Sequence, residues 1–361
     1  MKAQETSSTE DNPNDERFTK MPPRIQVRKP LPGHYPRIVD WLARNGHEHR
    51  AFHLHRLWSR PQAAEERSSC LVAVWERELI GFLRYNKRKL SYGSASVNTA
   101  IMTDCIVVDN HPQIIHFLIS HLMTDLAEQG AHLVLWRKPV YLTPWWGFDA
   151  LWQDHYLQFK SPHIENAAVV YNTRIATETD IPGLMALYTD YWQGSITVKR
   201  SHADWLALIT QVDIEIVIDA DAQIVGYSGG AENEVQEAAS SSVNITRLLT
   251  DSLFQQARWY VPEDSLIYQH LLSQGIESQY SAEQWYGRVI QGQQFARSLL
   301  PMLAKSHNGR IQFHSDKVEF LGGAGLLISY HQLLQMLLSD TRQSILDLPP
   351  TPVHIAPLDW G

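Results

Sequence analysis

The stretch "DCIVVDNHPQIIHFLISHLM", residues 104–123, carries the strongest structural signal in this chain. Its first residues, 104–108, are mostly apolar and β-branched, which predicts a strand. Apolar residues then recur at helical spacing, at Ile115, Leu118, Ile119, Leu122 and Leu126. Pro112 suits the first turn of a helix and Gly130 its end, so we expect the helix to begin within a residue or two of Pro112.

A strand that runs directly into a helix is a common place for phosphate binding, because amide groups and the helix dipole converge there. Such junctions usually contain glycines that let the ligand approach the backbone. This junction has no glycine between Asp104 and Gln129. Asp109 also stands at the helix entrance, where a carboxylate favours the dipole and repels a polyanion. The backbone N–H groups at the start of the helix are therefore expected to find partners within the protein instead of binding a phosphate.

Length and composition describe a globular protein of two or three domains. The chain has 361 residues, 44% of them hydrophobic, and a net charge of −8. We expect no binding to nucleic acid or membranes, because basic residues form no long block. The two cysteines, Cys70 and Cys105, are expected to be buried thiols. With no apolar leader or membrane span in the sequence, the expected location is cytoplasmic.

Two segments of the chain resemble each other. "IQVRKPLPGHYPRIVDWLARNG" begins at Ile25 and "NTRIATETDIPGLMALYTDYWQG" at Asn172, and each predicts a strand, a loop and an amphipathic helix. "CLVAVWERELIGFLRYN" and "IEIVIDADAQIVGYSGG" follow them and predict hairpins with an early glycine in the second strand. This order predicts a duplicated unit with two mixed α/β sheets, joined near residues 171–174. Coincidence between ordinary α/β hairpins is the alternative.

The C-terminal part has a different pattern. Residues 281–306, "SAEQWYGRVIQGQQFARSLLPMLAKS", are expected to be helical, and "GRIQFHSDKVEFLGG" alternates as a hairpin. "SYHQLLQMLLSD" predicts a second helix beginning at Ser329 or Tyr330. A smaller α+β unit is therefore expected before the proline-rich ending "LPPTPVHIAPLDWG".

The order of these motifs resembles the GNAT superfamily of acyl-CoA-dependent N-acetyltransferases. More narrowly, it is similar to three-part proteins of the enhanced intracellular survival type, which have two GNAT-like domains and a sterol-carrier-like domain. The polar composition of residues 1–23, almost free of apolar residues, predicts a disordered tail. The resemblance implies a mixed α/β fold with GNAT-like domains at 24–172 and 173–280, and a sterol-carrier-like α+β domain at 281–361. It is carried by the stretches quoted above together with "VYLTPWWGFDALW", residues 140–152.

The resemblance also implies where acetyl-CoA, the expected acyl donor, would bind. In the family, Gln or Arg, two residues, Gly, one residue, and Gly or Ala follow the strand and hold the pyrophosphate. Gln113 fits the first position, but His116 and Leu118 stand where small residues belong, so the loop is degenerate. The implied cofactor-binding residues are Ile106, Val107, Val108, Gln113 and His116.

Acyl transfer to an amine needs a general base and a general acid. In the resembling family a tyrosine before the "GF" element is the acid and the C-terminal carboxylate can be the base. Here the resemblance implies Tyr141 as the acid; the alternative is that Tyr141 packs in a core. It implies the carboxylate of Gly361 as the base; the alternative is that Gly361 is an ordinary terminus. The ungapped position is Thr143, so Tyr141 needs a distorted loop. Asp104 is a third candidate, either orienting a water or making a strand-end hydrogen bond.

Four histidines lie close together at His47, His49, His53 and His55. His49 and His53 are spaced for one helix face, yet no cysteine or third ligand is near, so we expect no metal site but a solvated face beside the acceptor. Trp136, Trp145, Trp146 and Trp152 are expected to be interface core, with an apolar ligand pocket as the alternative.

Two functions remain open from the sequence. The first is an N-acetyltransferase that acts on a small amine and has a degenerate acetyl-CoA loop. The second is a catalytically inactive GNAT-like protein that binds a ligand or partner. The sequence also leaves the oligomeric state open, including a homo-oligomer.

Overall fold

The structure is a computed structural model that describes residues 25–59, 69–108, 111–139, 146–158, 172–231, 234–246, 258–261, 265–306, 311–321, 326–338 and 353–354. These residues pack as two compact units. Unit 1 contains the described residues within Met1–Tyr85, Asp104–Leu126 and Trp145–Gly147. Unit 2 contains those within Asn86–Thr103, Ala127–Pro144 and Phe148–Gly361.

The secondary structure follows the predicted duplication. The elements of the first repeat are β1 (Ile25–Arg28), η2 (Pro32–His34), α1 (Tyr35–Arg44), α2 (Glu48–Trp58), β2 (Cys70–Trp75), β3 (Glu78–Tyr92), β4 (Ala95–Val107), α4 (Pro112–Glu128), β5 (Leu133–Pro139) and β6 (Asp149–Gln158). Those of the second are β7 (Asn172–Ile175), η4 (Glu178–Asp180), α5 (Ile181–Tyr191), β8 (Ile196–Lys199), α6 (His202–Gln211), β9 (Ile214–Ile218), β10 (Ile224–Ala231), β11 (Glu234–Ser240), β12 (Arg258–Trp259), α8 (Leu266–Ser273) and β13 (Glu277–Val289). The elements after them are α9 (Gly292–Ser298), α10 (Leu300–Ser306), β14 (Ile311–Phe313), β15 (Lys317–Phe320), β16 (Leu326–Ser329), α11 (Tyr330–Leu338) and β17 (Val353–His354).

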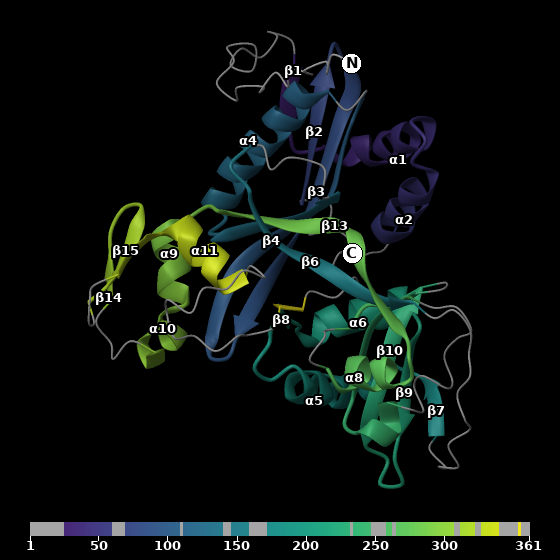
Figure 1. The fold of residues 1–361 in the computed structure, drawn as a ribbon. Coiled ribbons are helices and arrows are strands. Elements are labelled where there is room, and N and C mark those ends of the chain that lie inside the picture. Colours follow the sequence, from purple (N-terminus) through teal and green to yellow (C-terminus); the bar gives the residue numbers. More distant parts are fainter. Residues whose placement is uncertain are drawn as a thin grey trace, which may run out of the picture. The chain divides into compact units, whose positions relative to one another are not determined.

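Unit 1 is a sheet with helices on both faces. Helices α1 and α2 lie on one side of β1, β2 and β3, and α4 lies on the other (Figure 1). The α4 side packs closely at Gly81, where an added Cβ atom would lie 3.0 Å from Ile114 and 3.1 Å from Leu118. A larger residue at this position would push α4 away, which gives the early glycine of the predicted hairpin a packing reason.

The strand and helix predicted from residues 104–123 are confirmed. Strand β4 runs to Val107 and α4 begins at Pro112, so His116 and Leu118 lie inside the helix. Leu118 is fully buried. Asp109 lies outside the described residues.

The mixed α/β fold class is confirmed, but the expectation that the two repeats keep separate sheets is wrong. In unit 2, β13 pairs antiparallel with both β5 and β6. Strand β6 in turn pairs with β12 of the second repeat. The ladder of unit 2 therefore continues from β4 and β5 to β11, β10, β9 and β7 without a break. Each repeat contributes a long strand to its neighbour, and this exchange cannot be deduced from either repeat alone.

The exchanged strand also corrects a second expectation. Residues 281–289, predicted to be helical, belong to β13, because cross-strand pairing such as Gln284 with Lys138 fixes them in a sheet. Helix begins only at Gly292. The predicted hairpin at 311–320 is confirmed as β14 and β15, and the second helix begins at Tyr330 as expected.

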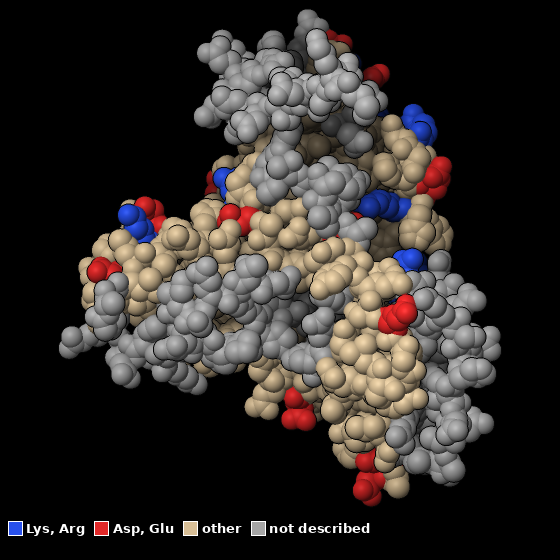
Figure 2. Space-filling model, in the orientation of Figure 1, with Lys and Arg blue, Asp and Glu red and all other residues tan. Residues whose placement is uncertain are grey.

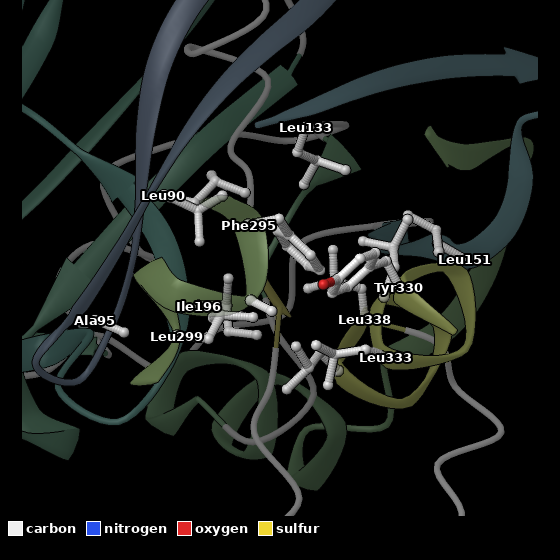
Figure 3. Close-up of a cluster of buried hydrophobic side chains, with 14 of the residues drawn as sticks. Leu90, Ala95, Leu133, Leu151, Ile196, Phe295, Leu299, Tyr330, Leu333 and Leu338 are labelled. Atoms are coloured by element: carbon white, nitrogen blue, oxygen red, sulfur yellow. The ribbon is translucent and has the colours of Figure 1, made fainter. Parts of the chain in front are cut away.

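The C-terminal elements of unit 2 form a three-stranded antiparallel sheet, β14–β15–β16, with α9, α10 and α11. Their apolar side chains share one core with residues of the large sheet. Figure 3 shows Phe295 and Tyr330 between Leu133 and Leu151, and Leu299 beside Ile196, within this cluster. The domain limits named from the sequence stay predictions, and so does the sterol-carrier likeness.

Candidate functional site

The central feature of unit 1 is a carboxylate held by two arginines. Asp104 lies in β4 and is only 5% exposed. Arg84 of β3 donates from Nε to Asp104 Oδ2 at 2.8 Å, and its side chain is buried as well. Arg50 of α2 donates from Nη1 to Asp104 Oδ1, and half of its side chain remains exposed. We call these three residues the Asp104 clamp.

The clamp changes what Asp104 can do. Burial by itself would raise the pKa of Asp104, but the charges and hydrogen bonds of Arg84 and Arg50 outweigh burial and lower the pKa. A carboxylate with a lowered pKa is a weak general base. The geometry therefore makes Asp104 a structural anion that orients two guanidinium groups. Arg50 keeps an exposed face.

The junction between β4 and α4 uses several of its own amides. His111 donates its backbone N–H to Val108 at 3.2 Å. Ile114 and Ile115 both donate to the His111 carbonyl, at 3.1 and 3.3 Å. Pro112 has no N–H to give. These described positions offer no turn of exposed amides like the one that a phosphate needs.

The structure brings together part of the predicted cofactor set. Ile106 and Val107 end β4, Val108 follows it, and Gln113 and His116 lie in the first turns of α4. Ile106 and Val108 pack against the core under α1 and α2, whereas Val107 lies toward Gly81 on the α4 side. Tyr141 and Gly361 lie outside the described residues, so their acid and base roles stay predictions.

The second repeat has a counterpart of the clamp in unit 2. Glu237 of β11 is completely buried and accepts two hydrogen bonds from Arg200, at 2.7 and 2.5 Å. Tyr227 of β10 donates its hydroxyl to the same carboxylate. Burial and the neighbouring Glu237 raise the pKa of Tyr227 well above its ordinary value, so it stays protonated as a donor. We call these residues the Glu237 clamp.

Arg200 is further enclosed by aromatic rings. Its guanidinium carbon lies 4.7 Å from the centre of the Tyr188 ring and 4.9 Å from that of Trp205. Such contacts stabilise a cation that has lost its water. The Glu237 clamp is therefore closed on all sides that the structure describes and leaves little space for a substrate.

Neither clamp was predicted as a unit, although Asp104 was named. The sequence signals were an arginine inside an apolar strand region, Arg84 in "IGFLRYN", and an arginine directly after one, Arg200 following "SITVK". A buried arginine requires a carboxylate partner. The sequence does not say which acidic residue is the partner, since Arg84 and Asp104 are 20 positions apart and Arg200 and Glu237 are 37 positions apart.

The histidine cluster and the tryptophans named from the sequence lie in both units. His49, His53 and His55 lie in α2, and His47 precedes it. In the described part of the chain, no group of three His, Cys, Asp or Glu side chains is arranged to hold a metal ion. Trp136 and Trp152 are buried in unit 2, where Trp152 stacks on Trp285 at 5.2 Å, and Trp145 lies outside the described residues.

The surface gives two further observations. On the face that Figure 2 shows, basic and acidic side chains of the described residues are interspersed. None of the described helices has the length and apolar character needed to cross a bilayer.

Comparison with known proteins gives structural relatives only. No family model and no curated protein sequence matches this chain. The fold is similar to a crystal structure of a GCN5-related N-acetyltransferase from Anabaena variabilis ATCC 29413, with a TM-score of 0.62 and 11% identity over 92% of this chain and 99% of that one.

Two more solved structures agree. A probable N-acyltransferase from Enterococcus faecalis V583, a conserved protein of unknown function, has a TM-score of 0.59 and 12% identity over 87% of this chain and 89% of that one. A GCN5-related N-acetyltransferase from Kribbella flavida has a TM-score of 0.56 and 11% identity over 82% and 76%. The chain thus has the fold of the GCN5-related N-acetyltransferases.

Proposed function

We propose that the chain is a GNAT-type N-acyltransferase that uses acetyl-CoA and a small amine, with the chemistry in the first repeat. The observation that carries the proposal is the likeness to GCN5-related N-acetyltransferases over 92% of the chain. It is supported by the arrangement of β4 and α4, a strand end that is followed within five residues by a helix N-terminus.

Each candidate residue has a defined part in this proposal. The backbone at Ile106, Val107 and Val108 would line the thioester arm, and Gln113 and His116 would face the phosphates. Tyr141 would protonate the leaving thiolate, and the carboxylate of Gly361 would accept the amine proton. Asp104 positions Arg50 and Arg84 and does not itself take a proton, because its pKa is lowered.

A second function is favoured by one specific observation. Among the described residues of the β4–α4 junction, the backbone N–H groups of His111, Ile114 and Ile115 already donate to backbone carbonyl groups and are not free to bind a pyrophosphate. On this basis the first repeat is a ligand-binding or partner-binding domain that has lost acyl transfer. Both functions predict weak acetyl-CoA binding, with a dissociation constant above about 1 mM, or roughly −4 kcal/mol.

The two functions are separated by measuring binding and product together. The intact protein is titrated with acetyl-CoA by calorimetry, and acetylated product is followed by mass spectrometry with a panel of primary amines. Acetyl transfer that saturates with acetyl-CoA, even at millimolar concentration, supports the transferase. Micromolar binding of acetyl-CoA would show that the absence of glycines at the β4–α4 junction does not prevent acetyl-CoA binding. Absence of product at all concentrations overturns the transferase and leaves the binding domain.

A further inference from the structure

A large groove lies in unit 1 on the side of the sheet that carries α1. Its volume is about 1280 Å³, more than the roughly 300–1,000 Å³ of typical small-molecule sites. The floor is formed by Gln26 and Arg28 of β1, Val72 and Val74 of β2, and Ile80 of β3. Register places Arg28 opposite Val72 and Gln26 opposite Val74, so polar and apolar side chains lie side by side on one face of the sheet.

One wall of the groove is a single face of α1. Ile38, Trp41 and Arg44 of α1 follow each other at helical spacing. His34 at the end of η2 precedes them, and Arg37 lies beside them. Ile38 and Trp41 are buried and fix the helix on the sheet, whereas Arg37 and Arg44 are exposed. The wall therefore presents two guanidinium groups above an apolar base.

The other wall is the turn between β2 and β3, and its backbone is unusual. Glu76 and Arg77 both have positive φ, 49° and 73°, in a two-residue hairpin. Asn-Gly is the usual pair in such a turn. Non-glycine residues in the left-handed region cost on the order of 1 kcal/mol each, and such strain concentrates at functional sites. Here it places Arg77 on the groove.

The charge of the groove is opposite to that of the chain. Four arginines, Arg28, Arg37, Arg44 and Arg77, line it against two glutamates, while the whole chain carries −8. Burial lowers the pKa of His34, and the positive charges of Arg28 and Arg37 lower the pKa further. Within the described part of the chain, none of the four guanidinium groups has a carboxylate partner in an ion pair.

An aromatic ring completes the rim. Trp75 ends β2, lines the groove and is 45% exposed. A large exposed indole next to unpaired guanidinium groups suits a ligand that has both a flat ring and several negative charges. Arginine forks match phosphate oxygens in pairs, and indole faces stack on aromatic bases.

We propose that this groove binds a nucleoside polyphosphate, with the phosphates on Arg28, Arg37 and Arg77 and the base against Trp75. The site lies on the α1 side of the sheet and uses none of the residues assigned to acyl transfer except the neighbouring Val108. The inference stands on the groove alone and does not depend on the proposed transferase function.

The test is calorimetry on the intact protein with ATP, inorganic tripolyphosphate and adenosine, at low and at high salt. We expect ATP to bind, tripolyphosphate to bind about tenfold more weakly, and adenosine to give no measurable heat. Because the contact is between exposed charges, ATP affinity should fall as salt rises. Absence of ATP binding up to millimolar concentration at low salt overturns the proposal.

Variants locate the site. Arg37→Gln and Arg77→Gln should each weaken ATP binding about tenfold, whereas Arg56→Gln, an exposed arginine of α2 away from the groove, removes the same charge and should change nothing. Trp75→Leu should weaken ATP binding and leave tripolyphosphate binding unchanged. Equal losses with Arg56→Gln would show attraction by general charge and overturn the site. Equal binding of ATP and tripolyphosphate in both the unmodified protein and Trp75→Leu would overturn the nucleoside part.

Discussion

The two repeats place a buried carboxylate at the same point of the fold and enclose it to different degrees. Asp104 and Glu237 each lie three residues before the end of the strand that leads into the next helix, in β4 and β11. Both are held by arginine. The Glu237 clamp has a fully buried guanidinium from Arg200, whereas the Asp104 clamp includes Arg50, whose side chain is 49% exposed.

The difference in exposure between Arg200 and Arg50 indicates a structural role for the Glu237 clamp and leaves Arg50 of the Asp104 clamp able to contact a ligand. A buried ion pair with every partner satisfied holds the strand in place and excludes water, but it has no group left for a substrate. In unit 1, water reaches Arg50, and the α1 side of the sheet also carries the arginine-lined groove. The Glu237 clamp therefore has the contacts of a structural ion pair, whereas the Asp104 clamp and the groove keep exposed guanidinium groups in unit 1.

The largest expected effect is on the closed clamp. Glu237→Gln should lower the free energy of unfolding by about 3 to 5 kcal/mol, because Arg200 stays buried without its counter-charge. Urea denaturation followed by tryptophan fluorescence measures the change. Trp205, which contacts Arg200, provides a local signal.

A paired substitution controls for loss of packing. Arg200→Met together with Glu237→Leu removes both charges and keeps apolar volume, so most of the stability should return. Tyr227 loses its acceptor in this variant, so the recovery should be incomplete. A single Glu237→Gln effect below about 1 kcal/mol contradicts the description of this clamp as a closed ion pair.

The second expected effect is on the Asp104 clamp and depends on pH. Asp104→Asn should cost about 2 kcal/mol, less than Glu237→Gln, because water can replace part of the contact to Arg50. The folded pKa of Asp104 lies below its unfolded value. The clamp therefore stabilises fully above an unfolded pKa of about 3.9, and this stabilisation is lost as the pH falls through the folded pKa.

Denaturation curves between pH 2 and pH 7 test this dependence. The difference in stability between the unmodified protein and Asp104→Asn should shrink as acid is added. A difference that stays constant over this range would mean that the charge of Asp104 does not contribute to stability and that only the shape of its side chain does.

Sequence reasoning succeeded where the cause is local. The helix start at Pro112 follows from proline geometry, and the hairpin of β2 and β3 follows from alternation and a short polar turn. Gly46 with φ of 79° ends the first predicted helix as expected. Each of these features is determined within about ten residues of sequence.

It failed where partners are distant in the chain. Residues 281–289 contain helix-compatible apolar spacing, but Trp285 pairs with Arg137, almost 150 positions earlier. Arg200 and Glu237 are 37 positions apart, and neither position carries a local pattern. Tertiary pairing overrides local preference in a strand, so strand exchange between repeats requires the structure.

The smallest expected effect is the one that distinguishes the two clamps most clearly. Arg50→Gln should lower the free energy of unfolding by only about 0.5 kcal/mol, because an exposed guanidinium gains little from its ion pair in water. Arg56→Gln, on the same helix and also exposed, should cost nothing measurable and serves as the matched control. Salt should reduce the Arg50 effect, since the pair is open to solvent on one side. A loss as large as that of Glu237→Gln would mean that Arg50 is held as tightly as Arg200, and the two repeats would then be equally closed to ligands.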